Sequence, residues 1–268
     1  MGRDRRPPRR GTRKPAAQTS WDPLATWYNG WVGEYGSEYH RAVALPAILG
    51  LLDAKRGERI LDMGCGQGVL AESIHRAGAH YVGVDASPRL IEMARKQHGA
   101  WGRFLLADAG DLSRMRDLEP GSVDAAVFLL SLQDMDPLEK VLTSTARMLK
   151  ASGRVIVLMT HPAFRVPRQS GWGIDEGRKL VYRRIDRYLT PLPVPMKPFP
   201  GQQGVSRSFH RPVSAYVNSL SECGLRTDRM EEIPAHKLDV AGSTRRGGEL
   251  ARQEIPLFLG LRAVRCGA

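Results

Sequence analysis

The chain has 268 residues, the size of one domain with extensions, and a net charge of +12 at pH 7. It has no apolar run long enough to cross a membrane, and its first residues lack the apolar core of a signal peptide. Its three cysteines are widely spaced and form no CxxC pair, which argues against a structural zinc site and favours a reducing environment. We therefore expect a cytoplasmic protein with one core, no membrane contact and no bound metal.

Residues 1–20 hold seven arginines or lysines and one aspartate. They contain too little apolar surface to fold, so we predict a disordered basic tail followed by a single domain over 21–268. A basic arm can bind RNA or another anionic surface, and it can equally act as a solvated extension that aids solubility.

Six aromatic residues crowd into residues 21–40, which indicates that this segment is buried against another part of the chain. Residues 38–54 then place apolar side chains at helical spacing. Together these features predict an aromatic and helical lid over 21–54.

Residues 59–68, Arg-Ile-Leu-Asp-Met-Gly-Cys-Gly-Gln-Gly, are typical of a buried strand that ends in a glycine turn. Gly64, Gly66 and Gly68 form a GxGxG pattern, and apolar residues beyond them continue at helical spacing. A strand, a glycine turn and a helix open a nucleotide site at the carboxyl edge of an α/β sheet, because glycine lets the backbone turn and a ligand approach. A tight turn without a ligand is the alternative interpretation.

Two further predicted strands end in an acidic residue at the same edge of the sheet. Residues 81–85 end in Asp85, which lies about 20 residues after the glycine turn, where a carboxylate typically holds ribose hydroxyls. Residues 104–106 are followed by Asp108, for which capping of a loop is the alternative role.

The next elements continue an alternation of strands and helices. Ser87 before a proline predicts a helix start, and Asp136 with Glu139 three residues later predicts a capping box. Residues 123–130 and 153–159 read as the fourth and fifth buried strands.

Residues 161–212 interrupt this alternation and carry ten arginines or lysines against three acidic residues. The segment begins at the carboxyl end of the fifth strand, on the ligand side of the sheet, so we predict a substrate-covering insert. After it, Pro212 opens a helix, 226–233 and 256–264 form two strands, and 234–254 is a loose polar loop.

Together, the segments 61–68, 83–87 and 107–108 resemble the class I S-adenosylmethionine-dependent methyltransferases, with the type-11 methyltransferase domain as the nearest group. The resemblance covers residues 55–160. A dinucleotide fingerprint would place its third glycine at Val69, which disfavours a dehydrogenase. The resemblance implies an α/β fold with a doubly wound, Rossmann-like, seven-stranded sheet, mostly parallel with an antiparallel edge strand and helices on both faces.

The resemblance also implies S-adenosyl-L-methionine as the cofactor and S-adenosyl-L-homocysteine as its product. Asp85 would accept charge-assisted hydrogen bonds from the ribose, Asp108 would accept from the adenine amino group, and Asp62 would reach the methionine ammonium. The expected cofactor-binding set is Asp62, Gly64, Cys65, Gly66, Gly68, Asp85, Ala86, Asp108, Ala109, Leu130 and Gln133.

For the acceptor, the resemblance implies that the lid folds over the site, so Tyr28 and Tyr39 are candidate substrate-binding residues. A hydrophobic lid without polar contacts is the alternative. Arg165, Arg168 and Arg184 in the insert are candidates to clamp a carboxylate or phosphate of the acceptor, or else to pair with acids of the insert itself.

Two histidines are candidates for the general base, because imidazole takes up a proton near neutral pH. His161 lies just after the fifth strand and His210 lies near the end of the insert. For His161, which precedes a proline, a role in a turn is the alternative.

We predict a methyltransferase that uses in-line displacement on a small-molecule, possibly anionic, acceptor. An RNA methyltransferase that uses the basic tail, and a nucleotide-binding protein without transferase activity, are the alternatives. The fourth strand ends in residues 130–133, Leu-Ser-Leu-Gln, and lacks the Asn/Asp-Pro-Pro-aromatic motif of enzymes that methylate amide or base amino groups.

Overall fold

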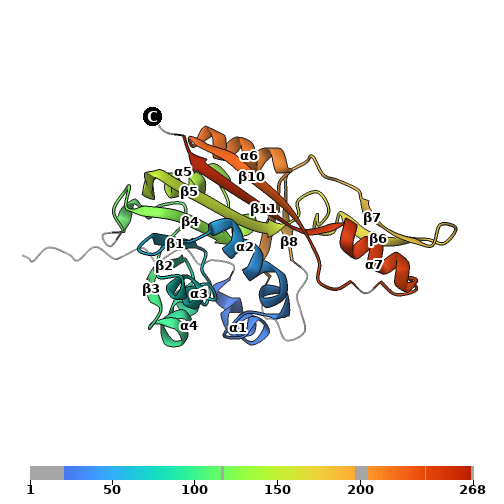
Figure 1. The fold of residues 1–268 in the computed structure, drawn as a ribbon, viewed down its shortest axis with the longest axis horizontal. Helices are drawn as coiled ribbons and strands as arrows, with labels where there is room; N and C mark the ends of the chain where they lie inside the picture. Colours follow the sequence, from blue (N-terminus) through green and yellow to red (C-terminus); the bar gives the residue numbers. More distant parts are fainter. Residues whose placement is uncertain (1–20, 116–117, 197–204, 239, 267–268) are drawn as a thin grey trace, which may run out of the picture.

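The computed structural model describes residues 21–115, 118–196, 205–238 and 240–266. The predicted basic tail at 1–20 lies outside these residues. A seven-stranded sheet in the order β10-β11-β5-β4-β1-β2-β3 forms the centre of the molecule (Figure 1). Its strands are β1 (Arg59–Met63), β2 (His80–Asp85), β3 (Gly102–Leu106), β4 (Val123–Leu129), β5 (Leu149–Thr160), β10 (Leu225–Pro234) and β11 (Pro256–Arg265).

The pairing confirms the predicted mixed sheet. Strands β3, β2, β1, β4 and β5 are parallel to one another. Strand β11 is antiparallel to both β5 and β10, so the antiparallel strand lies one place inside the edge of the sheet. The order reverses between β1 and β4, which is the point at which open α/β sheets bind ligands.

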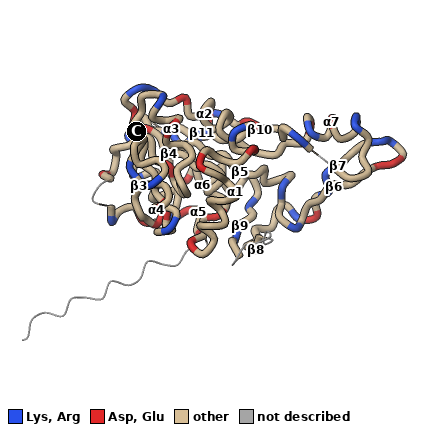
Figure 2. Tube along the Cα trace, turned by 90° about the horizontal axis from the view of Figure 1, so that it is seen from below, with Lys and Arg blue, Asp and Glu red and all other residues tan. Residues whose placement is uncertain are grey.

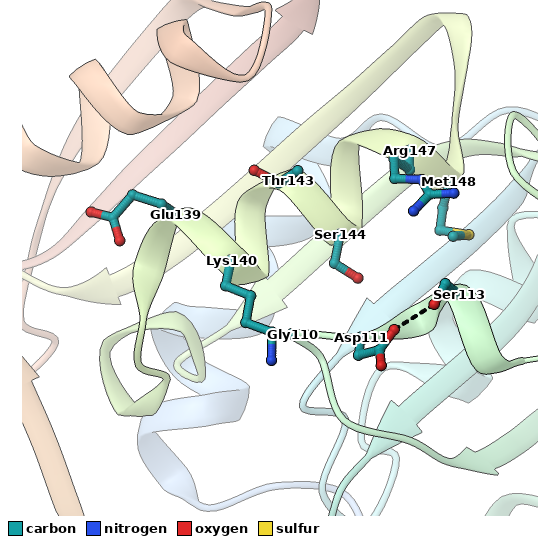
Figure 3. Close-up of a pocket in the computed structure, with 9 residues that line it drawn as sticks. All are labelled: Gly110, Asp111, Ser113, Glu139, Lys140, Thr143, Ser144, Arg147 and Met148. Atoms are coloured by element: carbon teal, nitrogen blue, oxygen red, sulfur yellow. Dashed lines mark hydrogen bonds between the residues drawn. The ribbon is translucent and has the colours of Figure 1, made fainter.

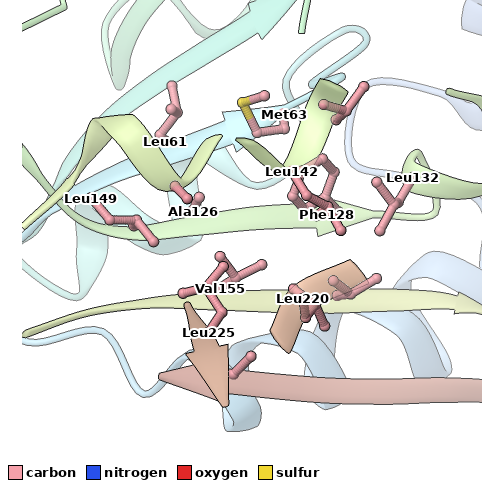
Figure 4. Packing of buried hydrophobic residues seen from close by; sticks show 14 of the residues in the cluster. Leu61, Met63, Ala126, Phe128, Leu132, Leu142, Leu149, Val155, Leu220 and Leu225 are labelled. Atoms are coloured by element: carbon pink, nitrogen blue, oxygen red, sulfur yellow. The ribbon is translucent and has the colours of Figure 1, made fainter. Parts of the chain in front are cut away.

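Helices cover both faces of the sheet, as predicted. One face carries α2 (Leu45–Leu52), α3 (Ala71–Arg76) and α4 (Pro88–His98), and the other carries α5 (Leu138–Met148) and α6 (Val213–Glu222). Alternate residues of each strand enter the two cores, so Leu61 and Phe128 pack with α5 and α6 (Figure 4), whereas Ile60 packs with α2 and α3.

The predicted capping box at the start of α5 is wrong. Pro137 is the N-cap residue, and no side chain caps the helix. The carboxylate of Asp136 instead accepts a hydrogen bond from Arg211 Nη2 at 2.7 Å. A long-range ion pair has therefore replaced the local capping interaction.

The predicted loose loop over 234–254 is also wrong, because it contains α7 (Arg245–Glu254). The Thr244 hydroxyl caps this helix by accepting from the Gly247 amide at 3.1 Å. Gly247 lowers helix propensity, yet a Cβ there would stand 2.6 Å from the Lys179 carbonyl oxygen. Gly247 therefore weakens the helical pattern in the sequence, and it also allows α7 to approach the backbone at Lys179.

The insert consists of two hairpins. Strands β6 (Ser170–Asp175) and β7 (Leu180–Ile185) form the first, and β8 (Leu192–Pro195) and β9 (Arg207–His210) form the second. The first hairpin and α7 project together away from the sheet (Figure 1), and both basic and acidic residues occur along them (Figure 2). The β8–β9 hairpin instead contacts the β4–α5 connection, near the ligand edge.

The N-terminal segment forms a short 3₁₀ turn, η1 (Asp22–Leu24), then α1 (Ala25–Val32), then a π-helical turn, η2 (His40–Ala44), that runs into α2. Further 3₁₀ turns are η3 (Leu112–Arg114) and η4 (Leu132–Asp134). In the part of the chain that the structure describes, no helix has the length and apolar composition needed to cross a membrane.

Candidate cofactor and acceptor site

The glycine turn after β1 is fixed by the neighbouring strand. The amides of Gly64 and Cys65 both donate to the Val84 carbonyl, at 2.8 and 3.0 Å, and the Gly66 amide donates to Asp85 Oδ2 at 2.9 Å. Gly64 and Gly68 have φ angles of +70° and +90°. These left-handed conformations favour glycine over any other residue.

Neighbouring side chains contact the glycine turn from two sides, and at Gly64 they leave little room for a side chain. A Cβ at Gly64 would lie 2.7 Å from Met135 Cε and 2.8 Å from Ser131 Cβ. At Gly66 the nearest atom would be Tyr28 Cε1, at 3.5 Å. The glycine turn is therefore enclosed by the β4–α5 connection on one side and by the N-terminal lid on the other.

Asp85 occupies the predicted position at the tip of β2. Its Oδ1 accepts from the Ser87 amide at 2.8 Å, while Oδ2 accepts from Gly66. Burial raises the pKa of Asp85, although these backbone hydrogen bonds oppose the effect. A carboxylate has about four acceptor sites, so both oxygens can still accept from a ribose diol.

Asp62 is only 2% exposed, and its Oδ2 accepts from the Tyr81 hydroxyl at 2.7 Å. Its Oδ1 has no hydrogen-bond partner. Burial raises the pKa of Asp62 to about 7, the bond from Tyr81 lowers it, and the charge of Asp85 raises it further. A buried carboxylate oxygen without a partner fits the ammonium group of a methionine moiety, so these residues suit S-adenosylmethionine.

The raised pKa of Asp62 predicts a specific pH dependence of stability. An unfolded aspartate has a pKa of about 3.9, so between roughly pH 4 and pH 7 the folded state binds more protons than the unfolded state. The free energy of unfolding should therefore fall as pH rises through this range, by at most about 1.4 kcal/mol per pH unit. Urea denaturation at pH 5 and pH 8 should show a smaller loss for Asp62→Asn than for wild type, and equal losses would contradict the prediction.

The other predicted cofactor residues lie along the same edge. Asp108 is exposed, and its Oδ1 accepts from the Gly110 amide at 2.8 Å, which is a loop-capping contact. Leu130 follows β4 with a φ of +54°, and its carbonyl accepts from Gln133 Nε2 at 3.0 Å. The Gln133 Oε1 is buried and has no partner. Ala86 and Ala109 are half-buried at the tips of β2 and β3.

Cys65 is buried in the glycine turn, and burial raises the pKa of its thiol well above the usual range. It is therefore a packed, protonated side chain rather than a nucleophile.

The two tyrosines singled out in the lid lie in different places. Tyr28 stands over the glycine turn, and its ring is 5.3 Å from that of Trp21. Tyr39 packs edge-on against His236 at 4.6 Å, at the end of β10. Only Tyr28 is brought to the glycine turn.

The two candidate bases also differ. Both nitrogens of His161 are engaged, because Nδ1 accepts from the Ala163 amide at 3.2 Å and Nε2 contacts Glu232 Oε1 at 2.9 Å. Burial lowers the pKa of His161, while Glu232 raises it. His210 donates from Nε2 to the Tyr188 carbonyl at 2.7 Å, which leaves Nδ1 as an acceptor. In this conformation, His161 has no lone pair left for a substrate proton.

The three candidate arginines of the insert are separated. Arg165 lies 4.9 Å from the centre of the Trp172 ring, and burial lowers its pKa to about 10. Arg184 pairs with Asp186 at 2.9 Å, with both side chains exposed, and Arg168 is exposed. Arg165 alone among the three lines a small cavity at the ends of β4 and β5. The other side chains of this cavity include Gln133, Thr160, Ser208, Phe209, His210, Arg211 and Tyr216.

A larger cavity of about 280 Å³ lies between η3 and α5, beyond the Asp108 loop (Figure 3). Its lining includes Lys140, Thr143 and Arg147 but none of the predicted site residues. The chemistry is therefore assigned to the glycine turn, where the carboxylates converge. Among the described residues, no group of histidine, cysteine and acidic side chains is arranged to hold a metal ion.

Sequence reasoning missed two residues beside the site. Asp134 ends η4, immediately after β4, and Arg211 is a buried arginine whose Nη1 has no partner. Asp134 could have been identified from the sequence, because it follows the carboxyl end of a parallel strand, and the same position identified Asp85 as a candidate. Nothing local in the sequence indicated that Arg211 would be buried.

Comparison with known proteins agrees with this geometry. Residues 61–157 match the family model described as "Methyltransferase domain", of type 11. A solved structure of an S-adenosylmethionine-dependent methyltransferase from Mesorhizobium loti is 26% identical, with a TM-score of 0.65 over 82% of this chain and 96% of that one. Residues 61–157 belong to the methyltransferase domain family, and the fold is that of S-adenosylmethionine-dependent methyltransferases. The cofactor predicted from the sequence is thus the one that defines its class.

Curated relatives match a smaller share of the chain. Ubiquinone biosynthesis O-methyltransferase of Xylella fastidiosa is 29% identical over 146 residues, which are 52% of this chain and 58% of the relative. Demethylmenaquinone methyltransferase of Thermobifida fusca is 27% identical over 170 residues, which are 61% and 71% of the two chains. The chain therefore spans little more than half the length of the first of these relatives.

Proposed function

We propose that this chain transfers the methyl group of S-adenosylmethionine to a nucleophilic atom of a small-molecule acceptor. The observation that carries the proposal is the 2.9 Å hydrogen bond from the Gly66 amide to Asp85, beside the unpartnered oxygen of Asp62. One edge of the sheet thus offers acceptors for a ribose diol and for an ammonium group, joined by a glycine turn that a ligand can approach.

Bound there, the cofactor supplies an activated methyl group, so the protein needs chiefly to orient the partners and exclude water. Asp85 and Asp62 fix the two ends of the methionine–ribose portion, and Tyr28 covers the turn between them. Orientation of this kind contributes about 7–11 kcal/mol in well-aligned intramolecular reactions.

The cavity proposed for the acceptor favours a small molecule with a polar group. The cavity that contains Arg165 and Arg211 is bordered by the β8–β9 hairpin and lies at the ends of β4 and β5. The names of the curated relatives, a ubiquinone biosynthesis O-methyltransferase and a demethylmenaquinone methyltransferase, support a phenol-like or quinol-like acceptor. The two arginines favour one that also carries an anionic group.

The proposal can be tested by measuring S-adenosylhomocysteine formation with a panel of hydroxylated aromatic acids. Matched acids without the hydroxyl serve as controls, and calorimetric titration with S-adenosylhomocysteine establishes cofactor binding first. We expect micromolar binding and turnover that requires the hydroxyl. Binding without turnover on any acceptor would favour a non-catalytic nucleotide-binding protein.

Total RNA belongs in the same panel, because residues 1–20 carry seven arginines or lysines. An RNA methyltransferase would methylate RNA, and its affinity for RNA would fall steeply as the salt concentration rises. It would also lose RNA affinity when residues 1–20 are deleted. Salt-independent turnover of a small acceptor would exclude that alternative.

A further inference from the structure

Arg211 is a buried arginine between β9 and α6, and it is 8% exposed. Its Nη2 donates to the Met135 carbonyl at 3.0 Å and to Asp136 Oδ1 at 2.7 Å. Both of these acceptors belong to the connection between β4 and α5. One side of the guanidinium is therefore held in a fixed position beside the carboxyl end of β4.

The other side of this guanidinium is not satisfied. Arg211 Nη1 is buried and has no hydrogen-bond partner in the part of the chain that the structure describes. A buried charged donor without an acceptor is costly, and native proteins contain few of them. A ligand group that accepts a hydrogen bond from Nη1 would remove this cost.

Arg211 and Arg165 line the same small cavity at the carboxyl ends of β4 and β5. Arg165 lies near the start of the insert, shortly after β5, whereas Arg211 lies at its end. The Arg165 Nε donates to the Pro256 carbonyl at 3.2 Å, and its guanidinium carbon lies 4.9 Å from the centre of the Trp172 ring. The two ends of the insert thus each bring one guanidinium to this cavity.

Acidic side chains do not balance these charges at the cavity. None of the described residues that line it is acidic, and the ion pair found for its two arginines is that of Arg211 with the half-exposed Asp136. Arg183 adds a third guanidinium, 5.0 Å from the same Trp172 ring. Burial and the charge of Arg183 lower the pKa of Arg165 to about 10, which leaves it positive at neutral pH. The cavity therefore favours an anionic group.

The size and walls of the cavity restrict which anion it can take. Its volume of about 20 Å³ is room for a small polar group but not for an aromatic ring. The Phe209 ring forms one wall, with its centre 5.5 Å from the guanidinium carbon of Arg211. A planar carboxylate fits a small space beside a guanidinium better than a tetrahedral phosphate does. The cavity is thus suited to one substituent of an acceptor whose ring lies outside it.

We propose that Arg211, together with Arg165, binds a carboxylate of the methyl acceptor and so determines which acceptors are used; this rests on the proposed methyl transfer. Arg211 Nη1 donates to one carboxylate oxygen, and Arg165 supplies the second positive charge. Because Asp136 already holds Arg211 in place, little side-chain freedom is lost on binding. A carboxamide of the same shape carries no negative charge and leaves both arginines unpaired, so the subsite discriminates against it.

Calorimetry on the complex with S-adenosylhomocysteine tests this proposal. 4-Hydroxybenzoate and its neutral analogue 4-hydroxybenzamide are each titrated into the saturated protein. We expect wild type to bind the acid about ten- to hundredfold more tightly than the amide, because only the acid makes charge-assisted hydrogen bonds. Arg211→Gln should remove this preference by weakening binding of the acid, while its affinity for S-adenosylhomocysteine stays that of wild type.

Three further variants separate recognition from other effects. Asp136→Asn removes the ion pair but keeps the Arg211 charge and its bond to the Met135 carbonyl, so it should keep most of the preference. Arg187→Gln removes an exposed arginine of the insert that does not line the cavity, and it should bind both compounds as wild type does. Arg165→Gln should lose part of the preference, and it serves as the test if Arg211→Gln does not fold.

Equal binding of the acid and the amide by wild type would overturn the inference, and so would a full preference in folded Arg211→Gln or Arg165→Gln. Loss of the preference in Asp136→Asn as complete as in Arg211→Gln would show a structural role for the arginine instead. Phenyl phosphate binding more tightly than benzoate, or a wild-type complex that binds none of these compounds, would also contradict it. A folded wild type that does not bind S-adenosylhomocysteine would overturn the proposed function itself, so the two failures are distinguishable.

Discussion

Replacing Asp85 by alanine should weaken binding of S-adenosylhomocysteine by about 1.5–3 kcal/mol, or roughly ten- to hundredfold. The carboxylate is expected to accept from the ribose hydroxyls, and hydrogen bonds to a charged group fall in this range. In addition, Asp85 binds the amides of Gly66 and Ser87, so the variant also loses two contacts that shape the glycine turn. Calorimetric titration of wild type and variant in parallel measures the loss.

Asp111→Ala is a suitable control for this experiment. Asp111 lies beyond β3, and its carboxylate contacts Ser113 and Arg114 rather than the glycine turn. We expect it to bind S-adenosylhomocysteine as wild type does. Unchanged affinity in a folded Asp85→Ala protein would mean that the carboxylate at the tip of β2 does not hold the ligand.

Gly68→Ala should destabilise the folded protein. Gly68 has a φ of +90°, and a Cβ there would lie 2.6 Å from Cε1 and 2.8 Å from Cζ of Phe104. A left-handed alanine costs about 1–2 kcal/mol, and overpacking against a buried ring adds about 1–3 kcal/mol. Chemical denaturation should therefore show a decrease of about 2–5 kcal/mol in the free energy of unfolding.

Gly121→Ala separates the two contributions. Gly121 has a φ of +71°, but a Cβ there would meet no atom within 4 Å, so this variant introduces only the backbone strain. Phe104→Leu combined with Gly68→Ala should recover part of the loss by making room beside the turn. If Gly68→Ala and Gly121→Ala lose equal stability, the contact with Phe104 does not constrain the third glycine.

The parts of the fold that could be predicted from the sequence are those set by local pattern. Strands β1, β2 and β4 are mostly apolar because both of their faces are buried, and the Ser87 cap depends only on residues within one turn. The acids at strand tips followed from the direction of parallel strands. In each case the information lies within a few residues of the element.

The parts that could not be predicted depend on contacts between distant residues. Asp136 looked like a helix cap, but Arg211, at the far end of the insert, binds it instead. Gly247 favoured a loop in the sequence, whereas in the structure it lies in α7 against the Lys179 carbonyl. His161 is fixed by Glu232 on β10, a partner that no local pattern could identify.

The insert and α7 leave the sheet at the same place. The family match ends at Val157, and the insert begins only a few residues later, after β5, while α7 lies in the β10–β11 connection next to it. The strands that hold Asp62 and Asp85, β1 and β2, lie on the other side of β4 from β5. The residues proposed to hold the methyl donor and the added hairpins thus occupy separate stretches of chain, so evolution can lengthen, shorten or exchange the hairpins without disturbing the proposed donor site. A fold that keeps one donor site and varies the segments beside it is well suited to evolve toward many different acceptors.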